Sequence, residues 1–233
     1  MIPLRDTTKS GSFPIVNTIF IALNIAVFIY EIWFTNDSRL FLYMYGLVPA
    51  VVTTDLEIGI INRVYPFFTS MFLHAGWMHI IGNMIFLYIF GDNIEHRMGH
   101  IKYLFFYILT GTIAALIQFL ININSTIPIV GASGAISGVL GAYLLFFPKS
   151  RILTVVPILF FIRLIHLPAT VFIFVWFLIQ FLGGISSAGR ASDVGGVAFW
   201  AHLGGFAAGL ILARHFDKLK YYSQKSFNGY YKN

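Results

Sequence analysis

Residues Gly131–Gly138 read GASGAISG and residues Ala201–Gly205 read AHLGG, and both stretches lie inside apolar segments. Ser133 is surrounded by small residues, and His202 has no other ionisable residue next to it. Ionisable side chains inside membrane segments are rare and usually face a partner or a cavity. Placed side by side, a serine and a histidine make a nucleophile and its base. We therefore expect the fold to bring these two segments together.

The composition is that of a membrane protein. Of the 233 residues, 58% are hydrophobic and only 10% are charged, and the mean hydropathy is +0.81. A soluble domain carries about 25% charged residues, which excludes that class. The net charge of +6 lies outside the apolar runs, so it bears on membrane orientation and predicts no nucleic-acid partner. Without cysteine, disulfides, thiol nucleophiles and cysteine metal sites are excluded.

Six apolar segments predict an all-α membrane protein, a bundle of six transmembrane helices. The segments are Ile15–Trp33, Trp77–Phe90, Ile101–Ile121, Ser133–Phe147, Leu167–Leu182 and Val197–Ala213. A spanning helix needs about 20 residues, so the second and fourth are short. Residues 153–165 form a further apolar stretch, interpreted as interfacial or as a hairpin leading into the fifth segment. We expect one domain over residues 15–213, between an N-terminal segment 1–14 and a basic tail 214–233.

The basic residues predict an orientation. Six spans put both termini on one side, and twelve of the fifteen lysines and arginines fall on that side. The other side holds only Arg39, Arg63 and Arg190. The positive-inside rule then predicts a multi-pass protein of the cell membrane with both termini in the cytoplasm. Residues 34–73 are expected outside, either free in water or lying in the membrane interface.

Ser133 is expected at the N-terminal end of the fourth span. Ser133–Phe147 would make about 22 Å of helix at about 1.5 Å per residue, which is shorter than a hydrocarbon core of about 30 Å. Ser133 would thus lie below the outer interface, where the free N–H groups of a helix start favour an oxyanion. The alternative is a small packing residue, because Gly134 and Gly138 form a GxxxG pair typical of membrane helix interfaces.

Small residues recur at four-residue spacing beside His202: Ala201, Gly205 and Gly209. Such a stripe would let the sixth span approach the face of the fourth that carries Gly134 and Gly138. This crossing would bring Ser133 within hydrogen-bond reach of the imidazole. The alternative is that His202 makes only a structural hydrogen bond between helices.

His79 and Asn83 are four residues apart and therefore share one helix face. Both side chains can donate to a developing negative charge. The alternative is a polar stripe that holds helices together. The spacing of His74 and His79 does not match the His-Glu-x-x-His zinc pattern, and we expect no metal.

These motifs together resemble the rhomboid family of intramembrane serine proteases, from about Pro14 to Ala213. The matching pieces are Gly131–Gly134, Ala201–Gly205, the spaced residues His74, His79 and Asn83, and the series Glu95, Arg97 and Gly99. The opening residues Met1–Asp6 are similar to those of a widespread group of bacterial six-span rhomboids.

The resemblance implies that Ser133 is the nucleophile and His202 the general base, a dyad without aspartate. His79, Asn83 and the Ser133 backbone N–H would form the oxyanion hole. It further implies cleavage of transmembrane protein substrates near their outer end, with no cofactor and with the lipid bilayer as the other partner. Glu95 and Arg97 would brace a cytoplasmic loop, the alternative being an exposed pair of little energetic value.

Two departures from the family pattern bear on this reading. Many relatives carry Trp-Arg in the outer loop where this chain has Tyr65-Pro66, which affects loop anchoring. Well-known relatives place an aromatic residue under the histidine ring, where this chain has Ser137. The Ser137 hydroxyl either orients His202 or bonds back to the carbonyl of Ser133, as serine commonly does in helices.

Two other classes of function compete with the peptidase. A rhomboid-like protein that only binds membrane clients would be favoured by a missing serine or histidine, and both are present. A transporter or channel would be favoured by charged residues within several spans, and the third to fifth apolar segments carry almost none. The sequence indicates neither the substrate's identity nor the oligomeric state.

Overall fold

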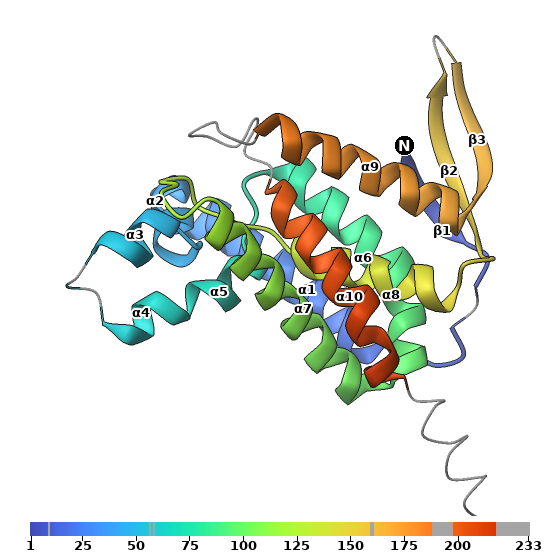
Figure 1. Ribbon diagram of the computed structural model, residues 1–233, viewed down its shortest axis with the longest axis horizontal. Coiled ribbons are helices and arrows are strands. Elements are labelled where there is room, and N and C mark those ends of the chain that lie inside the picture. The colour runs from blue at the N-terminus through green and yellow to red at the C-terminus, as the bar shows by residue number, and fades with distance from the viewer. Residues whose placement is uncertain (9, 56, 58, 159–160, 188–197, 218–233) are drawn as a thin grey trace, which may run out of the picture.

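The computed structural model describes the whole chain except residues 9, 56, 58, 159–160, 188–197 and 218–233. Its body is a bundle of long helices (Figure 1). Their bounds are α1 Ile15–Phe34, α6 Trp77–Met98, α7 His100–Ile121, α8 Ser133–Phe146, α9 Ala169–Ser187 and α10 Phe199–Phe216. Each overlaps one predicted apolar segment. α6 is longer than the second apolar segment: it continues past Phe90 with polar residues, among which Asn93, Glu95 and Arg97 form hydrogen bonds with other parts of the chain.

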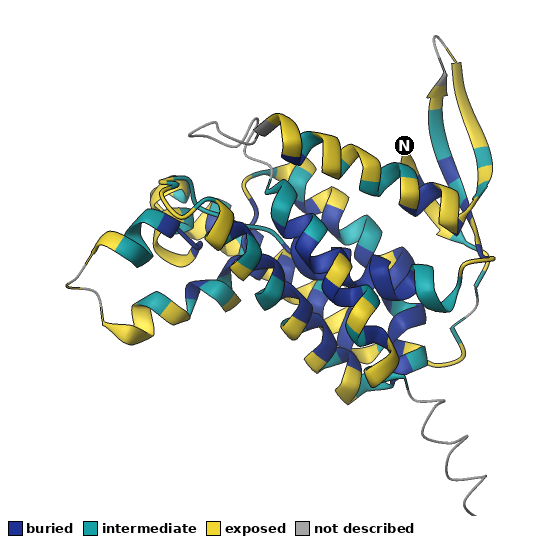
Figure 2. Ribbon diagram, viewed as in Figure 1, coloured by how far each residue is buried: buried dark blue, intermediate teal, exposed yellow. Residues whose placement is uncertain are grey.

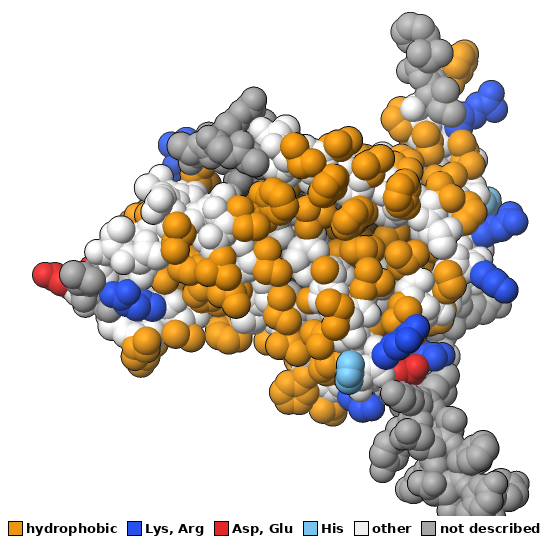
Figure 3. Space-filling model, viewed as in Figure 1, with side chains coloured by type: hydrophobic (Ala, Val, Ile, Leu, Met, Phe, Trp, Pro, Cys, Tyr) orange, Lys and Arg blue, Asp and Glu red, His pale blue; other side chains and the backbone are white. Residues whose placement is uncertain are grey.

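By length and composition, three helices among the described residues could cross a membrane: α1, α7 and α9. A fourth candidate is a bent pair, Ile60–Phe72 with Trp77–Met98, whose parts meet at 77°. α8 is apolar but shorter. In Figure 3, hydrophobic side chains cover the middle of one face, and Lys and Arg side chains gather at the end that carries the strands. The chain is a mainly helical membrane protein, and six spans stay a prediction.

The expectation of an all-α protein is wrong in one respect, since the structure contains a three-stranded antiparallel sheet in the order β1-β2-β3. The strands are β1 Ile2–Asp6, β2 Arg151–Ile158 and β3 Phe161–Pro168. β2 and β3 pair along their length, which confirms the hairpin interpretation of residues 153–165. The β-branched side chains of β2 favour extended backbone. β1 pairs with the other edge of β2, with Ile2 opposite Val155.

α8 lies at the centre of the bundle, and its residues Gly134–Tyr143 are all buried (Figure 2). It packs against α10, α7 and α6. A small-residue helix can accept neighbours on several sides because no side chain keeps their backbones apart. The first residue of α8 is Ser133, so the core of the bundle also fixes the position of that side chain.

Glycines of α10 make its crossing with α8, but the contacting face of α8 differs from the expected one. A side chain on Gly205 or Gly209 would overlap the carbonyl oxygen of Gly134 or Gly138, so α10 rests on the backbone of α8. The missing side chains of Gly134 and Gly138 face α7 instead. There, a Cβ on Gly134 would lie 2.7 Å from the Cβ of Ala114.

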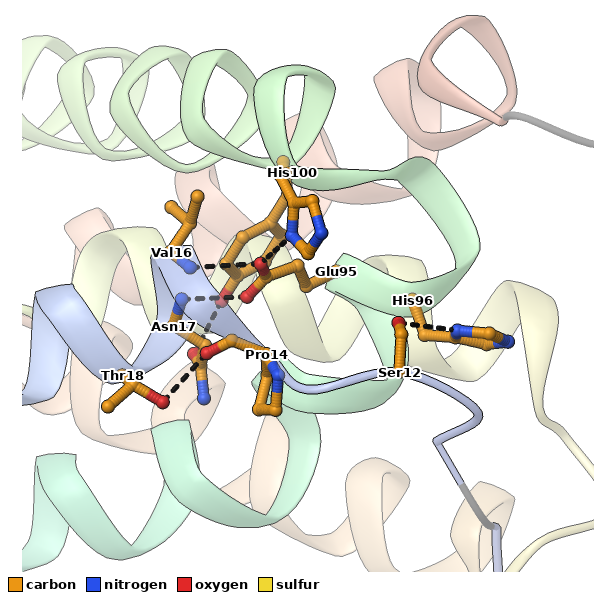
Figure 4. A network of polar contacts seen from close by, with 9 residues as sticks. Ser12, Pro14, Val16, Asn17, Thr18, Glu95, His96 and His100 are labelled. Atoms are coloured by element: carbon orange, nitrogen blue, oxygen red, sulfur yellow. Dashed lines mark hydrogen bonds and ion pairs between the residues drawn. The ribbon is translucent and has the colours of Figure 1, made fainter.

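Glu95 joins the end of α6 to the start of α1 (Figure 4). Its carboxylate is 1% exposed and accepts hydrogen bonds from the backbone N–H groups of Val16 at 2.9 Å and Asn17 at 2.7 Å. His100 Nδ1 lies 2.5 Å from the same carboxylate. A negative group at a helix start satisfies free N–H groups and opposes the positive dipole end. The alternative of an exposed Glu95–Arg97 pair is therefore wrong.

Arg97 connects a different set of helix ends. Its Nη2 donates to Asp217 Oδ2 at 2.8 Å, just after α10. Its guanidinium lies over the ring of Phe146, the last residue of α8, at 4.9 Å. The ends of α6, α8 and α10 are thereby held together on the side of the molecule where α1 begins.

The segment between α1 and α6 forms short helices on the left of Figure 1. They are α2 Ser38–Tyr45, α3 Pro49–Thr54, α4 Ile60–Val64, α5 Pro66–Thr69 and the 3₁₀ helix η1 Ser70–Phe72. The Tyr65 hydroxyl donates to the Met44 carbonyl at 2.7 Å, and Thr69 Oγ1 donates to the Tyr45 carbonyl at 2.6 Å. Pro66 opens α5, where a missing N–H is tolerated. The loop is thus anchored despite its departure from Trp-Arg.

The C-terminal end of α8 holds a polar cluster that ties β1 to the bundle. The Tyr143 hydroxyl donates to Asp6 Oδ2 and lies 2.9 Å from Ser150 Oγ. Asn93 Nδ2 donates to the same Asp6 oxygen at 3.1 Å, and Thr8 Oγ1 donates to Ser150 Oγ at 2.9 Å. The N-terminal segment is therefore bound to α6, α8 and the residues that lead into β2.

Candidate active site

Ser133 begins α8 directly after a sharp turn of the backbone. Gly131 has a φ of +120°, which favours glycine, and its N–H donates to the Ser70 carbonyl at 2.9 Å. A Cβ at position 131 would also lie 2.6 Å from His79 Nε2. Glycine is thus required here both for the turn and for the close approach of His79, which lines the same cavity as Ser133.

The structure brings Ser133 and His202 together, with Oγ and Nε2 2.7 Å apart. Ser133 is half-buried and comes from the start of α8, whereas His202 is 9% exposed and comes from the first turns of α10. The two side chains meet because Gly205, three residues after His202, lets α10 approach the α8 backbone. A hydroxyl in this contact can pass its proton to an imidazole nitrogen that carries a lone pair.

A cavity of about 600 Å³ opens beside this pair, and its lining includes Ser133, His202, His79 and Asn83. Asn83 is 7% exposed, and among the described residues its Nδ2 has no hydrogen-bond partner. A buried donor without a partner is costly, so it indicates a place where an oxygen of a bound molecule can accept. The structure thus places all four side chains proposed from the sequence around one space.

Three further residues of this region were not predicted. Gln180 of α9 places Oε1 2.7 Å from His202 Nδ1, and the ring centroid of Trp176 lies 6.1 Å from that of the imidazole. Gln118 of α7 accepts the backbone N–H of Ala201 at 3.0 Å. The available signal was weak: each glutamine is an isolated amide in a mainly apolar helix.

Ser137 does not contact the imidazole by hydrogen bonding. It is fully buried, and its Oγ donates to the Ser133 carbonyl at 2.6 Å, which is the local bond that serine commonly makes in helices. His74 is buried with its ring 5.0 Å from that of His79, centroid to centroid. Within the described part of the chain, no group of three His, Cys, Asp or Glu residues could hold a metal ion.

Comparison with known proteins gives consistent matches. Residues 62–217 match the Rhomboid domain, which is more than half of the chain. Rhomboid protease AarA of Providencia stuartii is 31% identical over 147 residues, covering 55% of this chain and 50% of the relative. Rhomboid-like protein 11, chloroplastic, of Arabidopsis thaliana is 32% identical over 118 residues, covering 51% and 37%. Rhomboid protein 1, mitochondrial, of Saccharomyces cerevisiae is 27% identical over 208 residues, covering 87% and 54%.

Fold and site together define a class: a helical membrane protein in which a serine and a histidine from two helices meet beside a cavity. The chain belongs to the rhomboid family. It spans only 37% to 54% of the length of the three relatives described. The family includes proteases, such as AarA.

Proposed function

We propose that this protein is an intramembrane serine endopeptidase that cleaves transmembrane proteins through a Ser133–His202 dyad. The observation that carries the proposal is the 2.7 Å contact between Ser133 Oγ and His202 Nε2 beside a cavity. The match to the Rhomboid domain supports it, since a relative such as AarA is named a rhomboid protease.

In the proposed reaction, His202 Nε2 accepts the hydroxyl proton of Ser133 as Oγ bonds to the peptide carbonyl carbon. The carbonyl oxygen becomes negative and is held by Asn83 Nδ2, His79 and the Ser133 backbone N–H. His202 then gives its proton to the leaving amine and the C–N bond breaks. Water, deprotonated by the same imidazole, frees the acyl group from Ser133. Each step uses only this chain, the substrate and water.

The proposed domain covers residues 15–213 in six spans, with the cavity toward the extracytoplasmic face of the cell membrane. The predominance of basic residues toward the predicted cytoplasmic side supports this orientation. The pairing of β1 with β2 and the Arg97–Asp217 ion pair are consistent with it, because they gather the chain segments expected on that side. A substrate helix must unwind locally to expose a carbonyl, so Gly or Pro near the cleavage point would favour it.

A fluorophosphonate probe tests the nucleophile directly in the purified membrane protein. We expect one adduct, on Ser133, and none in Ser133→Ala. Ser137→Ala is the matched control, since Ser137 lies on the same helix but bonds its own backbone. Unlabelled wild-type protein, or equal labelling of Ser133→Ala, would contradict the proposal.

A further inference from the structure

The imidazole of His202 has a partner at each of its two nitrogens. Ser133 Oγ lies 2.7 Å from Nε2, and Gln180 Oε1 lies 2.7 Å from Nδ1. The two partners come from different helices, α8 and α9, while the histidine comes from α10. The orientation of the ring is therefore fixed by a hydrogen-bond partner at Nδ1 and another at Nε2.

The acceptor at Nδ1 decides which nitrogen of a neutral imidazole carries the hydrogen. A neutral ring has one N–H donor and one lone pair, and an amide oxygen can only accept. With Gln180 Oε1 at Nδ1, the hydrogen resides on Nδ1 and the lone pair of Nε2 faces the Ser133 hydroxyl. In the opposite tautomer Nε2–H would donate to Ser133, and the ring could not take the serine proton.

We propose that Gln180 is a positioning residue that holds His202 in the tautomer required for a general base, an inference that rests on the proposed peptidase function. Gln180 has the same place in the geometry that an aspartate has in a Ser-His-Asp triad. An amide fulfils the orienting part of that role without a buried carboxylate, which is costly to desolvate inside a membrane bundle.

The surroundings of the ring support the assignment to Gln180. Trp176, one helical turn before Gln180, lies beside the ring, with the two ring planes tilted by 40°. His79 of α6 interacts electrostatically with His202. It does not compete with Gln180 for Nδ1, because its side chain lies near Gly131 and Ser133, and Ser133 is the partner of Nε2. Gln118, the other glutamine at this end of α10, bonds the backbone of Ala201 and not the imidazole.

The first test reads the tautomer itself and does not depend on catalysis. Protein labelled with ¹⁵N at histidine is purified in detergent, and the His202 ring signals are assigned by their loss in His202→Asn. Near neutral pH we expect Nδ1 to carry the hydrogen in the wild type, and this preference to be lost in Gln180→Leu. Gln118→Leu, the matched control, should leave it unchanged. A wild-type ring protonated at Nε2, or an unchanged preference in Gln180→Leu, overturns the inference.

The second test measures cleavage of a transmembrane substrate at several pH values. Gln180→Leu should lower kcat about tenfold with little change in KM, since one hydrogen bond that orients the base is lost. Gln180→Glu should recover most of the rate and move the acid limb of the kcat profile to higher pH, because a carboxylate stabilises the imidazolium. If wild type cleaves and Ser133→Ala does not, an unchanged profile in both Gln180 variants overturns the positioning role alone. Cleavage by Ser133→Ala would instead overturn the proposed function, while the tautomer measurement still decides on Gln180.

Discussion

The two ends of α8 hold their polar groups in opposite ways. At the N-terminal end, Ser133 faces a cavity, and nearby Asn83 Nδ2 is buried without a partner among the described residues. At the C-terminal end, the Tyr143 hydroxyl bonds both Asp6 and Ser150, so its hydrogen-bonding capacity is used within the protein. Buried polar groups that are satisfied add to stability, whereas unsatisfied ones reduce it and remain available to a bound molecule. One end of the helix is thus suited to chemistry and the other to holding the fold.

The largest expected difference between the two ends comes from the same substitution made at each. Ser133→Ala should reduce cleavage of a transmembrane substrate to background and leave the thermal unfolding midpoint nearly unchanged, because Ser133 is only half-buried. Ser150→Ala should keep the rate and lower the midpoint, because it removes a member of the Tyr143 cluster. Substrate cleavage and thermal unfolding of both variants, measured in the same detergent, provide the check. Normal turnover by folded Ser133→Ala would contradict the assignment.

Asn83→Ala should affect rate far more than stability. Loss of one oxyanion donor costs about 10²–10³-fold in kcat, roughly 3–4 kcal/mol. Since Asn83 Nδ2 has no partner among the described residues, its removal should not lower the unfolding midpoint. Steady-state kinetics separate the two possible roles: an increased KM with unchanged kcat would mean that Asn83 contacts the substrate in its ground state instead.

Between the two ends of α8 lies its close crossing with α10, where Gly205 and Gly209 rest on the backbone of Gly134 and Gly138. Added side chains there should lower the stability of the fold, as they do in a packed core. Gly205→Ala places a methyl group against the Gly134 carbonyl and should destabilise the protein by about 1–3 kcal/mol, with loss of activity as α10 moves. Gly82→Ala is the matched control, because a Cβ there meets nothing within 4 Å and alanine favours the helix. Equal unfolding midpoints of the two variants would show that the close crossing does not run through Gly205.

Asp6 makes the C-terminal end of α8 sensitive to pH. The pKa of the Asp6 carboxyl is raised from 3.8 to about 6, chiefly by burial and to a smaller extent by Asp92, while the hydrogen bond from Tyr143 opposes the change. The folded protein then holds this proton more tightly than the unfolded chain does. The contribution is full below about pH 4 and is lost as pH rises through about 6. Asp6→Asn should remove this decline in unfolding midpoint between pH 4 and 7; an identical decline in the variant would assign it to another group.

The smallest effect is expected for Ser137→Ala. The Ser137 hydroxyl bonds a carbonyl of its own helix, so its loss should change the rate by less than about twofold and leave the pH profile unchanged. A comparison with Gln180→Leu in the same assay sharpens the contrast, since that variant loses the bond to the imidazole. A tenfold slower Ser137→Ala would restore the orienting role considered for Ser137 from the sequence.

Much of the site could be predicted because its residues stand out against an apolar background. Ser133 and His202 are costly in membrane segments unless paired, and the small residues that follow each of them predict a close crossing. Gln180 gave no such signal. A single amide in an apolar helix reveals neither its rotation about the helix axis nor which of several neighbouring helices it faces.

The three-stranded sheet is the part of the fold that could be predicted only incompletely from the sequence. Residues 151–168 carry enough apolar and β-branched side chains to suggest a hairpin, one of the two interpretations open for this stretch. The remaining strand, β1, is different. It is five residues long, and four of the six apolar segments separate it in sequence from its partner β2. Pairing at that separation depends on where the intervening helices bring the chain, which a local pattern does not contain.

The position of β1 also has a consequence for the order in which the protein is built. Ile2 leaves the ribosome long before Val155, which lies opposite it and emerges only after α1, α6, α7 and α8 have been made. At about 5–20 residues per second, the strand waits on the order of ten seconds for its partner. Closure of the sheet is therefore a late event of biosynthesis, and it records that the first four long helices have already been synthesised.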